Sequence, residues 1–257
     1  ALAALLYVAV CTLMFFQQRR LMYFPQVTRV EAADTNFALQ RADVTLRGWQ
    51  SHPASGPARH AVIYLGGNAE RVEQALPLLR QWLPAHSIYT LAYRGYGASD
   101  GTPTESDLEQ DAVALYDAVQ QQHPQGQVLL LGRSLGTGVA AAVAAQRQPA
   151  RTALITPFDN MVDTVRDHYG WLPVRWLLRD RYPSDTRLAQ YQGAVLVLRA
   201  GLDTLVLPAR TDALERTLAT RHGAVLQVQH FPQADHISIL QGEGMGATLA
   251  QFAQGQP

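Results

Sequence analysis

Lysine is absent from this chain of 257 residues, and all 21 of its basic side chains are arginines. This absence excludes a lysine nucleophile and a lysine Schiff base. Cysteine occurs once, at Cys11, which excludes an intrachain disulfide and a cysteine-based metal site. The 21 acidic residues balance the arginines, so the formal net charge is zero and no overall field attracts nucleic acid. We therefore expect neither a metal nor a nucleic-acid partner.

Hydrophobic residues make up 47% of the sequence and charged residues 16%, which suits one large domain with a short appendage. Short apolar segments alternate with segments of helical length. This alternation is typical of α/β proteins, in which helices cover both faces of a mostly parallel sheet. The expected strands are residues 43–49 at an edge, 61–65, 87–93, 128–131, 153–155, 194–198 and 225–228, and the expected helices are residues 70–83, 104–122, 134–147 and a segment from 208 onward.

One long interval interrupts this alternation. Residues 158–191 contain no predicted strand, and their apolar residues, among them Trp171 and Trp176, lie among charges. An insertion of this length after a strand is typical of a small helical cap over a site at the carboxyl ends of the strands. The alternative is that these residues form ordinary helices packed on the sheet edge.

The N-terminal segment is apolar from Ala1 to Phe16 and then reaches QQRR at residues 17–20. A helix over the apolar residues would span about 24 Å, slightly less than a bilayer core of about 30 Å. A cleaved signal peptide would need a basic region before the apolar run, and a buried core helix would show a polar face. We predict that residues 1–25 are an uncleaved membrane anchor and that residues 26–257 form the globular domain.

The run GRSLG at residues 132–136 follows the strand predicted at 128–131 and precedes an alanine-rich helix. This strand, turn and helix are the context that the G-x-S-x-G nucleophile elbow requires. Its glycines permit a sharp turn and a close approach of helix to strand, which together hold the serine hydroxyl above the sheet. We therefore predict that Ser134 is a catalytic nucleophile.

A serine needs a base to become a strong nucleophile, and the base needs an orienting acid. Folds with this elbow place Asp or Glu and then His after the serine. The histidines that follow Ser134 are His168, His222, His230 and His236. We predict His236 as the base because it stands just beyond the last predicted strand and before a terminal helix. The others lie in the candidate cap, in a turn, or within the last strand.

For the orienting acid, we predict Asp203, which lies in the loop between the strand at 194–198 and the next helix. Asp159, after the preceding strand, is the main alternative. Asp235 adjoins His236, but neighbouring residues rarely face each other in the geometry of a triad. The non-catalytic alternative for Asp203 is simple helix capping.

Acyl transfer also needs N–H groups that stabilise the negative charge developing on the carbonyl oxygen. The backbone N–H of Leu135, the residue after the nucleophile, is one expected donor. The second is expected in the loop GGNA at residues 66–69, from Asn68 or Gly67. The glycines of this loop let the backbone approach a substrate closely.

These motifs resemble those of the ABHD-type serine hydrolases, which are membrane-anchored α/β-hydrolases often described as peptidase-like or lysophospholipase-like. The resemblance covers almost the whole chain and rests on LGGNAE at 65–70, YRGYGASDGTPTE at 93–105, GRSLG at 132–136, TPFD at 156–159 and GLD at 201–203. It implies an α/β-hydrolase fold and hydrolysis of esters or thioesters, often lipid-derived, with no metal or organic cofactor. The family commonly has His-Gly-Asn where this chain has Gly66-Gly67-Asn68, a difference that concerns the rigidity of the loop.

The segment 93–105 carries no obvious catalytic group. We expect it to be a tight loop that supports the site, with an ion pair between Arg94 and Asp100.

The predicted reaction is attack by Ser134 on a lipid acyl ester after His236 takes its proton, followed by hydrolysis of the acyl-enzyme. The apolar N-terminus predicts a place at the bacterial inner membrane, with the side of the catalytic domain left open. One alternative is a serine peptidase of the aminopeptidase type, which would use a carboxylate such as Asp159 or Glu70 to hold a free amine. Another is a non-catalytic membrane-bound scaffold.

Overall fold

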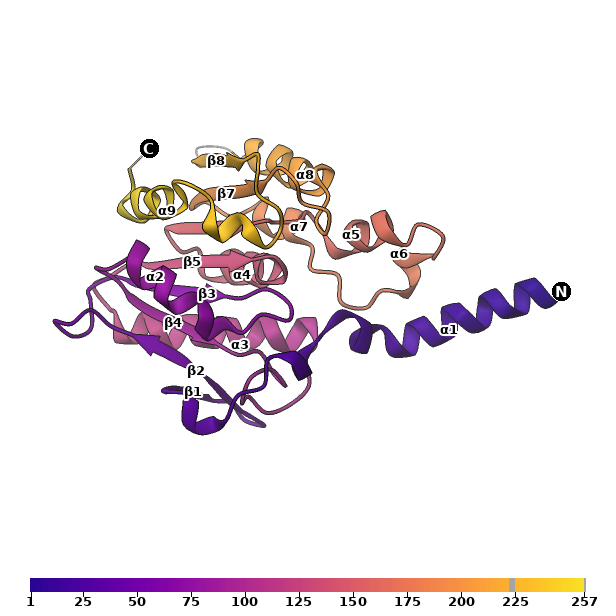
Figure 1. Ribbon diagram of the computed structural model, residues 1–257, viewed down its shortest axis with the longest axis horizontal. Helices are drawn as coiled ribbons and strands as arrows, with labels where there is room; N and C mark the ends of the chain where they lie inside the picture. Colours follow the sequence, from indigo (N-terminus) through magenta and orange to yellow (C-terminus); the bar gives the residue numbers. More distant parts are fainter. Residues whose placement is uncertain (222–224, 257) are drawn as a thin grey trace.

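The computed structural model describes residues 1–221 and 225–256, which are built around an eight-stranded sheet (Figure 1). The strands are β1 (Phe37–Gln40), β2 (Thr45–Ser51), β3 (Ala61–Leu65), β4 (Ser87–Leu91), β5 (Val128–Arg133), β6 (Arg151–Ile155), β7 (Ala194–Ala200) and β8 (Leu226–Phe231). Their order across the sheet is β1-β2-β4-β3-β5-β6-β7-β8. β2 is antiparallel to both its neighbours, and the pairs from β4 to β8 are parallel. The predicted mostly parallel sheet is confirmed.

β2 is an inner strand, so the prediction of an edge strand at residues 43–49 is wrong. The edge is β1, which pairs with β2 from Phe37 opposite Gly48 to Gln40 opposite Thr45. β1 has four residues, alternately half-buried and exposed. A strand with only two partly buried side chains gives a pattern too short to be recognised in the sequence.

Helices cover both faces of the sheet, as predicted (Figure 1). On one face α2 (Leu76–Trp82) contacts α9 (Met245–Gln254). The helices on the other face form a contacting row of α3 (Glu105–Gln122), α4 (Leu135–Arg147), α7 (Ser184–Leu188) and α8 (Pro208–Ala219). Short 3-10 helices lie at Pro25–Val27, Ala32–Asp34, Val72–Ala75 and Ser238–Gln241. The helix predicted at 70–83 is thus split, because its first turn is a 3-10 helix and only its second part is α2.

The loops that follow the parallel strands lie at one edge of the sheet. β3 and β4 are buried along their whole length, so the centre of the sheet is solid apolar core. Because parallel strands end at the same edge, the loops after β3, β5, β7 and β8 meet there. These are the loops that contain the predicted site residues.

Residues 158–191 contain no strand, in agreement with the sequence pattern. They include α5 (Met161–His168), α6 (Val174–Leu177) and α7. α7 contacts α4 and α8 and so belongs to the helical layer, whereas α5 and α6 stand beyond the sheet, on the side of α1 (Figure 1). We call residues 161–178 the cap segment.

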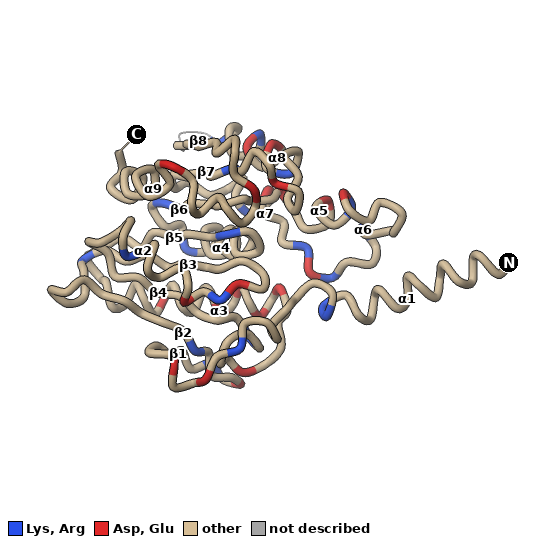
Figure 2. The backbone as a smooth tube through the Cα atoms, in the orientation of Figure 1, with Lys and Arg blue, Asp and Glu red and all other residues tan. Residues whose placement is uncertain are grey.

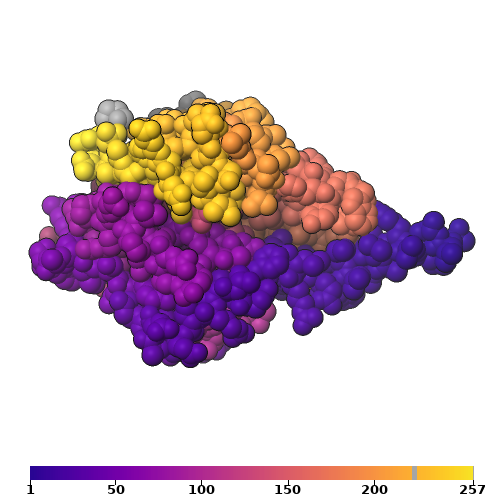
Figure 3. All heavy atoms as spheres, in the orientation of Figure 1, coloured from indigo at the N-terminus to yellow at the C-terminus, as the bar shows by residue number. Residues whose placement is uncertain are grey.

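The N-terminal helix α1 (Leu2–Met22) projects from the body of the molecule (Figures 1 and 3). It is longer than the apolar run because it continues through the polar residues 17–20. Its 21 residues span about 32 Å. Its charged residues, Arg19 and Arg20, lie at the inner end, and its outer turns carry no charge (Figure 2).

Candidate active site

Ser134 stands at the sharp turn between β5 and α4. Its backbone has φ 49° and ψ −119°, a strained conformation for a residue with a side chain. The Ser134 N–H donates to the Ile155 carbonyl at 2.9 Å, which holds the turn against β6. A Cβ atom on Gly136 would lie 2.0 Å from the Leu65 carbonyl oxygen, so only glycine lets α4 begin this close to β3. The Ser134 side chain is thereby held out at the carboxyl edge of the sheet.

His236 and Asp203 form a continuous hydrogen-bonded chain with this serine. His236 Nε2 lies 2.8 Å from Ser134 Oγ, and His236 Nδ1 lies 2.8 Å from Asp203 Oδ2. Asp203 Oδ1 accepts the N–H groups of Leu205 and Val206 at 2.9 Å each, which fixes the orientation of the carboxylate. Both Asp203 and His236 are buried. The arrangement suits proton transfer from the serine to the imidazole, with the carboxylate orienting the ring.

The alternative acids are engaged elsewhere. Asp159 Oδ2 pairs with Arg210 Nη1 at 3.1 Å, and burial raises the pKa of this carboxyl above its usual range. Asp235 Oδ1 accepts the N–H groups of Ile237 and Ser238 and so caps the turn after His236.

The other downstream histidines are also away from the serine. His168 Nε2 bonds to the Leu205 carbonyl at 2.9 Å, and His230 is an exposed residue of β8. His222 lies outside the described residues.

The loop at residues 66–69, after β3, comes within contact distance of the serine, and for its predicted role we call it the oxyanion loop. A Cβ atom on Gly67 would lie 3.4 Å from Ser134 Cβ, an ordinary van der Waals distance that places the loop directly beside the serine. The structure differs from the prediction for the Gly67 N–H, which already donates to Glu70 Oε2 at 2.6 Å. Within the described part of the chain, the backbone N–H groups of Asn68 and Leu135 have no protein acceptor. These two are therefore the available donors.

The oxyanion loop is fixed by contacts from three directions. Tyr93 Oη donates to the Gly66 carbonyl at 2.9 Å, and Tyr96 Oη donates to Asn68 Oδ1 at 2.7 Å. Asn68 Nδ2 donates to the carbonyl of Met22, at the end of α1. The family commonly has a histidine where this chain has Gly66, and these hydrogen bonds hold the loop in place without that imidazole. The contact with Met22 joins residues 46 apart and leaves no signal in the sequence.

Beside the loop, Glu70 and Arg133 form a half-buried ion pair at 3.1 Å. Tyr64 Oη donates to Glu70 Oε1 at 2.6 Å, and burial beside this carboxylate raises the pKa of Tyr64 well above its usual range. Arg133 Nη2 also donates to the His236 carbonyl at 3.3 Å. The pair thus connects the oxyanion loop to the loop that carries the predicted base.

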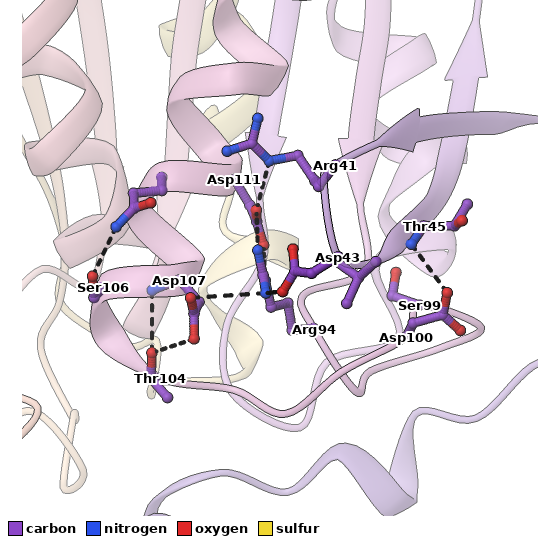
Figure 4. A network of polar contacts seen from close by, with 12 residues as sticks. Arg41, Asp43, Thr45, Arg94, Ser99, Asp100, Thr104, Ser106, Asp107 and Asp111 are labelled. Atoms are coloured by element: carbon purple, nitrogen blue, oxygen red, sulfur yellow. Dashed lines mark hydrogen bonds and ion pairs between the residues drawn. The ribbon is translucent and has the colours of Figure 1, made fainter.

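Arg94 does not pair with Asp100, so that expectation is wrong (Figure 4). Its Nε donates to Asp111 Oδ2 at 2.7 Å and its Nη1 to Asp43 Oδ2 at 2.6 Å, whereas Asp100 accepts the Thr45 N–H. The signal that sequence reasoning missed is the spacing of Asp107 and Asp111, which lie one helical turn apart on α3. The segment 93–105 is held to the body of the protein through this network.

We expect Arg94→Met to lower the free energy of unfolding by about 3 kcal/mol, because Asp111 is 4% exposed and would lose its main partner. Arg41 Nε also contacts Asp111, at 3.1 Å, but its side chain is 29% exposed. The matched variant Arg41→Met should therefore cost less than about 1 kcal/mol. Urea unfolding followed by circular dichroism measures both, and equal losses would contradict this account of the network.

A cavity of about 1090 Å³ opens onto Ser134 and His236. Side chains of α1, the oxyanion loop and the cap segment line it, and most of them are apolar. Among the described residues of its wall, the formally charged ones are Glu70, Arg71 and Arg133. A cavity with this lining suits a substrate with a large apolar part.

No group of three or more His, Cys, Asp or Glu side chains that could hold a metal occurs within residues 1–221 and 225–256.

The fold and the arrangement at its carboxyl edge are those of an α/β-hydrolase. Residues 56–184 match the family model described as serine aminopeptidase, S33. The chain belongs to the ABHD-type α/β-hydrolases.

Individual relatives agree with this assignment. The chain is 36% identical over 227 residues to an uncharacterised Mycobacterium tuberculosis protein, with 83% of this chain and 80% of that protein covered. It is 30% identical over 179 residues to the Danio rerio lysophosphatidylserine lipase ABHD12, with 61% of this chain and 44% of the lipase covered. An esterase structure from Pyrococcus furiosus superposes with a TM-score of 0.67 at 17% identity, covering 91% of this chain and 98% of the esterase, and shows the same fold.

Proposed function

We propose that this protein is a serine hydrolase that cleaves carboxylic esters or thioesters of lipid-derived acyl groups. The observation that carries the proposal is the series of hydrogen bonds from Ser134 Oγ to His236 and from His236 to Asp203. Each is 2.8 Å long, and the series lies at the wall of the apolar cavity. Ser134 is the proposed nucleophile, His236 the base and Asp203 the orienting acid.

In the proposed reaction, His236 Nε2 takes the hydroxyl proton while Ser134 Oγ forms a bond to the acyl carbon. The oxygen of the tetrahedral intermediate accepts hydrogen bonds from the Asn68 and Leu135 N–H groups. The intermediate then breaks its bond to the leaving alcohol or thiol, which receives the proton from His236. A water molecule, deprotonated by the same imidazole, releases the acid and restores Ser134.

The lipid-derived substrate is proposed from the shape and polarity of the site. The cavity wall includes Met161 and Leu172 of the cap segment and Leu21 of α1, which suit an alkyl chain. The name of the lipase relative, which acts on a lysophospholipid, supports the same substrate class.

An aminopeptidase is the alternative favoured by the description of the family model. Such an enzyme needs a carboxylate free to hold the substrate amine. Glu70, the acidic residue of the cavity wall, already binds Arg133, Tyr64 and the Gly67 N–H. Asp159 is paired with Arg210. Because neither carboxylate is free, the geometry favours an ester over a peptide.

We also propose that residues 1–25 anchor the protein in a membrane. α1 is long and apolar enough to cross a bilayer, and none of its residues is buried in the protein. A bacterial inner membrane is the proposed location.

Hydrolysis rates for a panel of esters, thioesters, lysophospholipids and aminoacyl amides test the proposed substrate class. We expect kcat/KM to rise with acyl length from two to about twelve carbons, because each buried CH₂ contributes about 0.8 kcal/mol. Aminoacyl amides should react at least about a hundredfold more slowly, since no free carboxylate holds their amine. A preference for the amides would show that the aminopeptidase alternative is right.

A further inference from the structure

The structure places the cap segment along α1 over most of the length of that helix. Tyr7 Oη donates to the Trp171 carbonyl at 3.0 Å, near the outer end of α1. Gln18 bonds to the Leu177 carbonyl at 3.1 Å and to the Arg179 N–H at 2.8 Å, near its inner end. The chain from Trp171 onward therefore follows α1 in the same direction. Figure 3 shows the two segments in contact.

The inner end of this contact is strong. Arg19 binds Asp180 through two hydrogen bonds of 3.0 Å, and Asp180 is buried. Tyr23 Oη contacts Tyr182 Oη at 2.7 Å. Asp180 and Tyr182 closely follow the cap segment in the chain. Because a bidentate arginine–carboxylate contact fixes geometry as well as distance, α1 and the cap segment form one unit.

This unit places two tryptophans where they can meet a bilayer. Trp171 and Trp176 are 58% and 83% exposed, values that are unusual for so large an apolar side chain. Tyr7 precedes the polar residue Gln17 by ten positions, or about 15 Å of helix. If α1 lies in a membrane up to its polar residues, Tyr7 lies below the headgroups. Trp171, which is hydrogen-bonded to Tyr7, then lies below the headgroups as well. Tyr7 also satisfies the Trp171 carbonyl, as a backbone acceptor in lipid requires.

Exposed arginines outnumber exposed acidic residues near the unit, where Asp167 of the cap segment is paired with Arg210 at 3.0 Å. Arg20, Arg175 and Arg179 are exposed, and Arg179 also lies over the Phe15 ring at 4.2 Å. Long arginine side chains beside an apolar surface reach phosphate groups while their stems stay in the lipid. Tryptophan is enriched at membrane interfaces, and arginines near the end of a membrane helix extend their charged groups to the headgroups.

The cavity of the site is bounded by the same two segments. Met14, Gln18 and Leu21 of α1 form one part of its wall, and Val165, Leu172 and Leu177 of the cap segment form another. The wall continues from these residues to Ser134. The space between α1 and the cap segment is therefore a path from the surface of the unit to the nucleophile.

We infer that the cap segment is a second membrane-binding surface, which sinks with α1 into one leaflet so that an acyl lipid passes sideways from the bilayer to Ser134. The inference rests on the proposed function and names the source of its substrate. The binding partner that we assign to this surface is the phospholipid bilayer, because the surface is continuous with α1 and carries exposed tryptophans and arginines. Trp171 and Trp176 bind the membrane and do not line the cavity.

Fluorescence quenching in vesicles tests the membrane contact without any catalysis. The full chain is reconstituted in phosphatidylcholine and phosphatidylglycerol vesicles whose acyl chains carry bromine. Two of its four tryptophans, Trp49 and Trp82, are packed in the globular body, Trp49 in the core and Trp82 against Gly246 of α9. We expect strong quenching in the parent and its loss in the Trp171→Phe, Trp176→Phe double variant. Equal quenching of the two proteins, or none in the parent, overturns the inference.

A matched pair of charge substitutions tests the consequence for the reaction. Trp176→Asp should lower the hydrolysis of a vesicle-embedded lysophospholipid at least about tenfold, because a charge resists insertion into lipid. Its hydrolysis of a water-soluble acetate ester should stay within about twofold, since Trp176 lies outside the cavity wall. The control Val228→Asp, on the exposed edge strand β8, should change neither rate.

The outcomes separate the two proposals. If Trp176→Asp slows both substrates equally, or neither, lateral access is wrong while ester hydrolysis by the parent still supports the proposed function. If the parent hydrolyses no ester, the proposed function fails, whereas the quenching result still decides whether the cap segment binds the membrane.

Discussion

Replacement of Ser134 by alanine is expected to reduce kcat for an acyl ester by a factor on the order of 10⁴ or more. The hydroxyl is the only group of the proposed site that forms a bond to the substrate, so its loss leaves no route to an acyl-enzyme. Binding should persist, because the cavity and the two free N–H groups remain. We therefore expect KM to change far less than kcat.

Covalent labelling with a fluorophosphonate probe checks this expectation independently of any chosen substrate. The parent should be labelled once, at Ser134, and Ser134→Ala should not be labelled. Ser106→Ala, which removes an exposed hydroxyl of α3, is the matched control and should be labelled like the parent. Labelling of Ser134→Ala at the rate of the parent would contradict the proposed nucleophile, and the scaffold alternative would then be favoured.

The site residues could be predicted from the sequence because each of them lies in a segment that follows a strand. The elbow glycines, the loop after β7 and the residue beyond β8 are local patterns, and the parallel sheet brings strand ends to one edge. Ser134, Asp203 and His236 could therefore be chosen from the sequence and are found within hydrogen-bond distance. Their catalytic roles remain a proposal that the substitutions test.

Other features depend on contacts between distant segments, which local patterns do not encode. The bond between Asn68 and Met22, and the alignment of α1 with the cap segment, follow from tertiary packing. The partner of Arg94 was missed because Asp100 is nearer in sequence, whereas α3 presents Asp111 to a guanidinium that is itself buried. The Gly67 N–H was expected to face the substrate, but it donates a hydrogen bond to the side chain of Glu70, three residues later. The first three contacts join elements whose relative positions only the fold determines, whereas the Gly67 contact is local and depends on the conformation of the loop.

Replacement of Asp203 by asparagine should lower kcat/KM by about 10⁴. Asparagine keeps the size of the side chain and can still accept the Leu205 and Val206 N–H groups through its oxygen. The atom near His236 Nδ1 then becomes an amide nitrogen, which donates a hydrogen bond and favours the ring tautomer with its proton on Nε2. In that tautomer Nε2 cannot accept the proton of Ser134. The fold should be nearly unchanged, so the loss reports on the proton transfer.

Asp159→Asn is the matched control because Asp159 was the rival acid and is similarly buried. Its loss leaves Arg210 with Asp163 and Asp167, at 3.4 and 3.0 Å, so the guanidinium keeps two partners. We expect kcat/KM to stay within about threefold of the parent, with a loss of stability below about 2 kcal/mol. Steady-state kinetics on a soluble ester and urea unfolding measure the two effects. If Asp159→Asn were the inactive variant and Asp203→Asn the active one, the acid would have to act from the loop after β6, and His236 would have to leave its position beside Asp203 during the reaction.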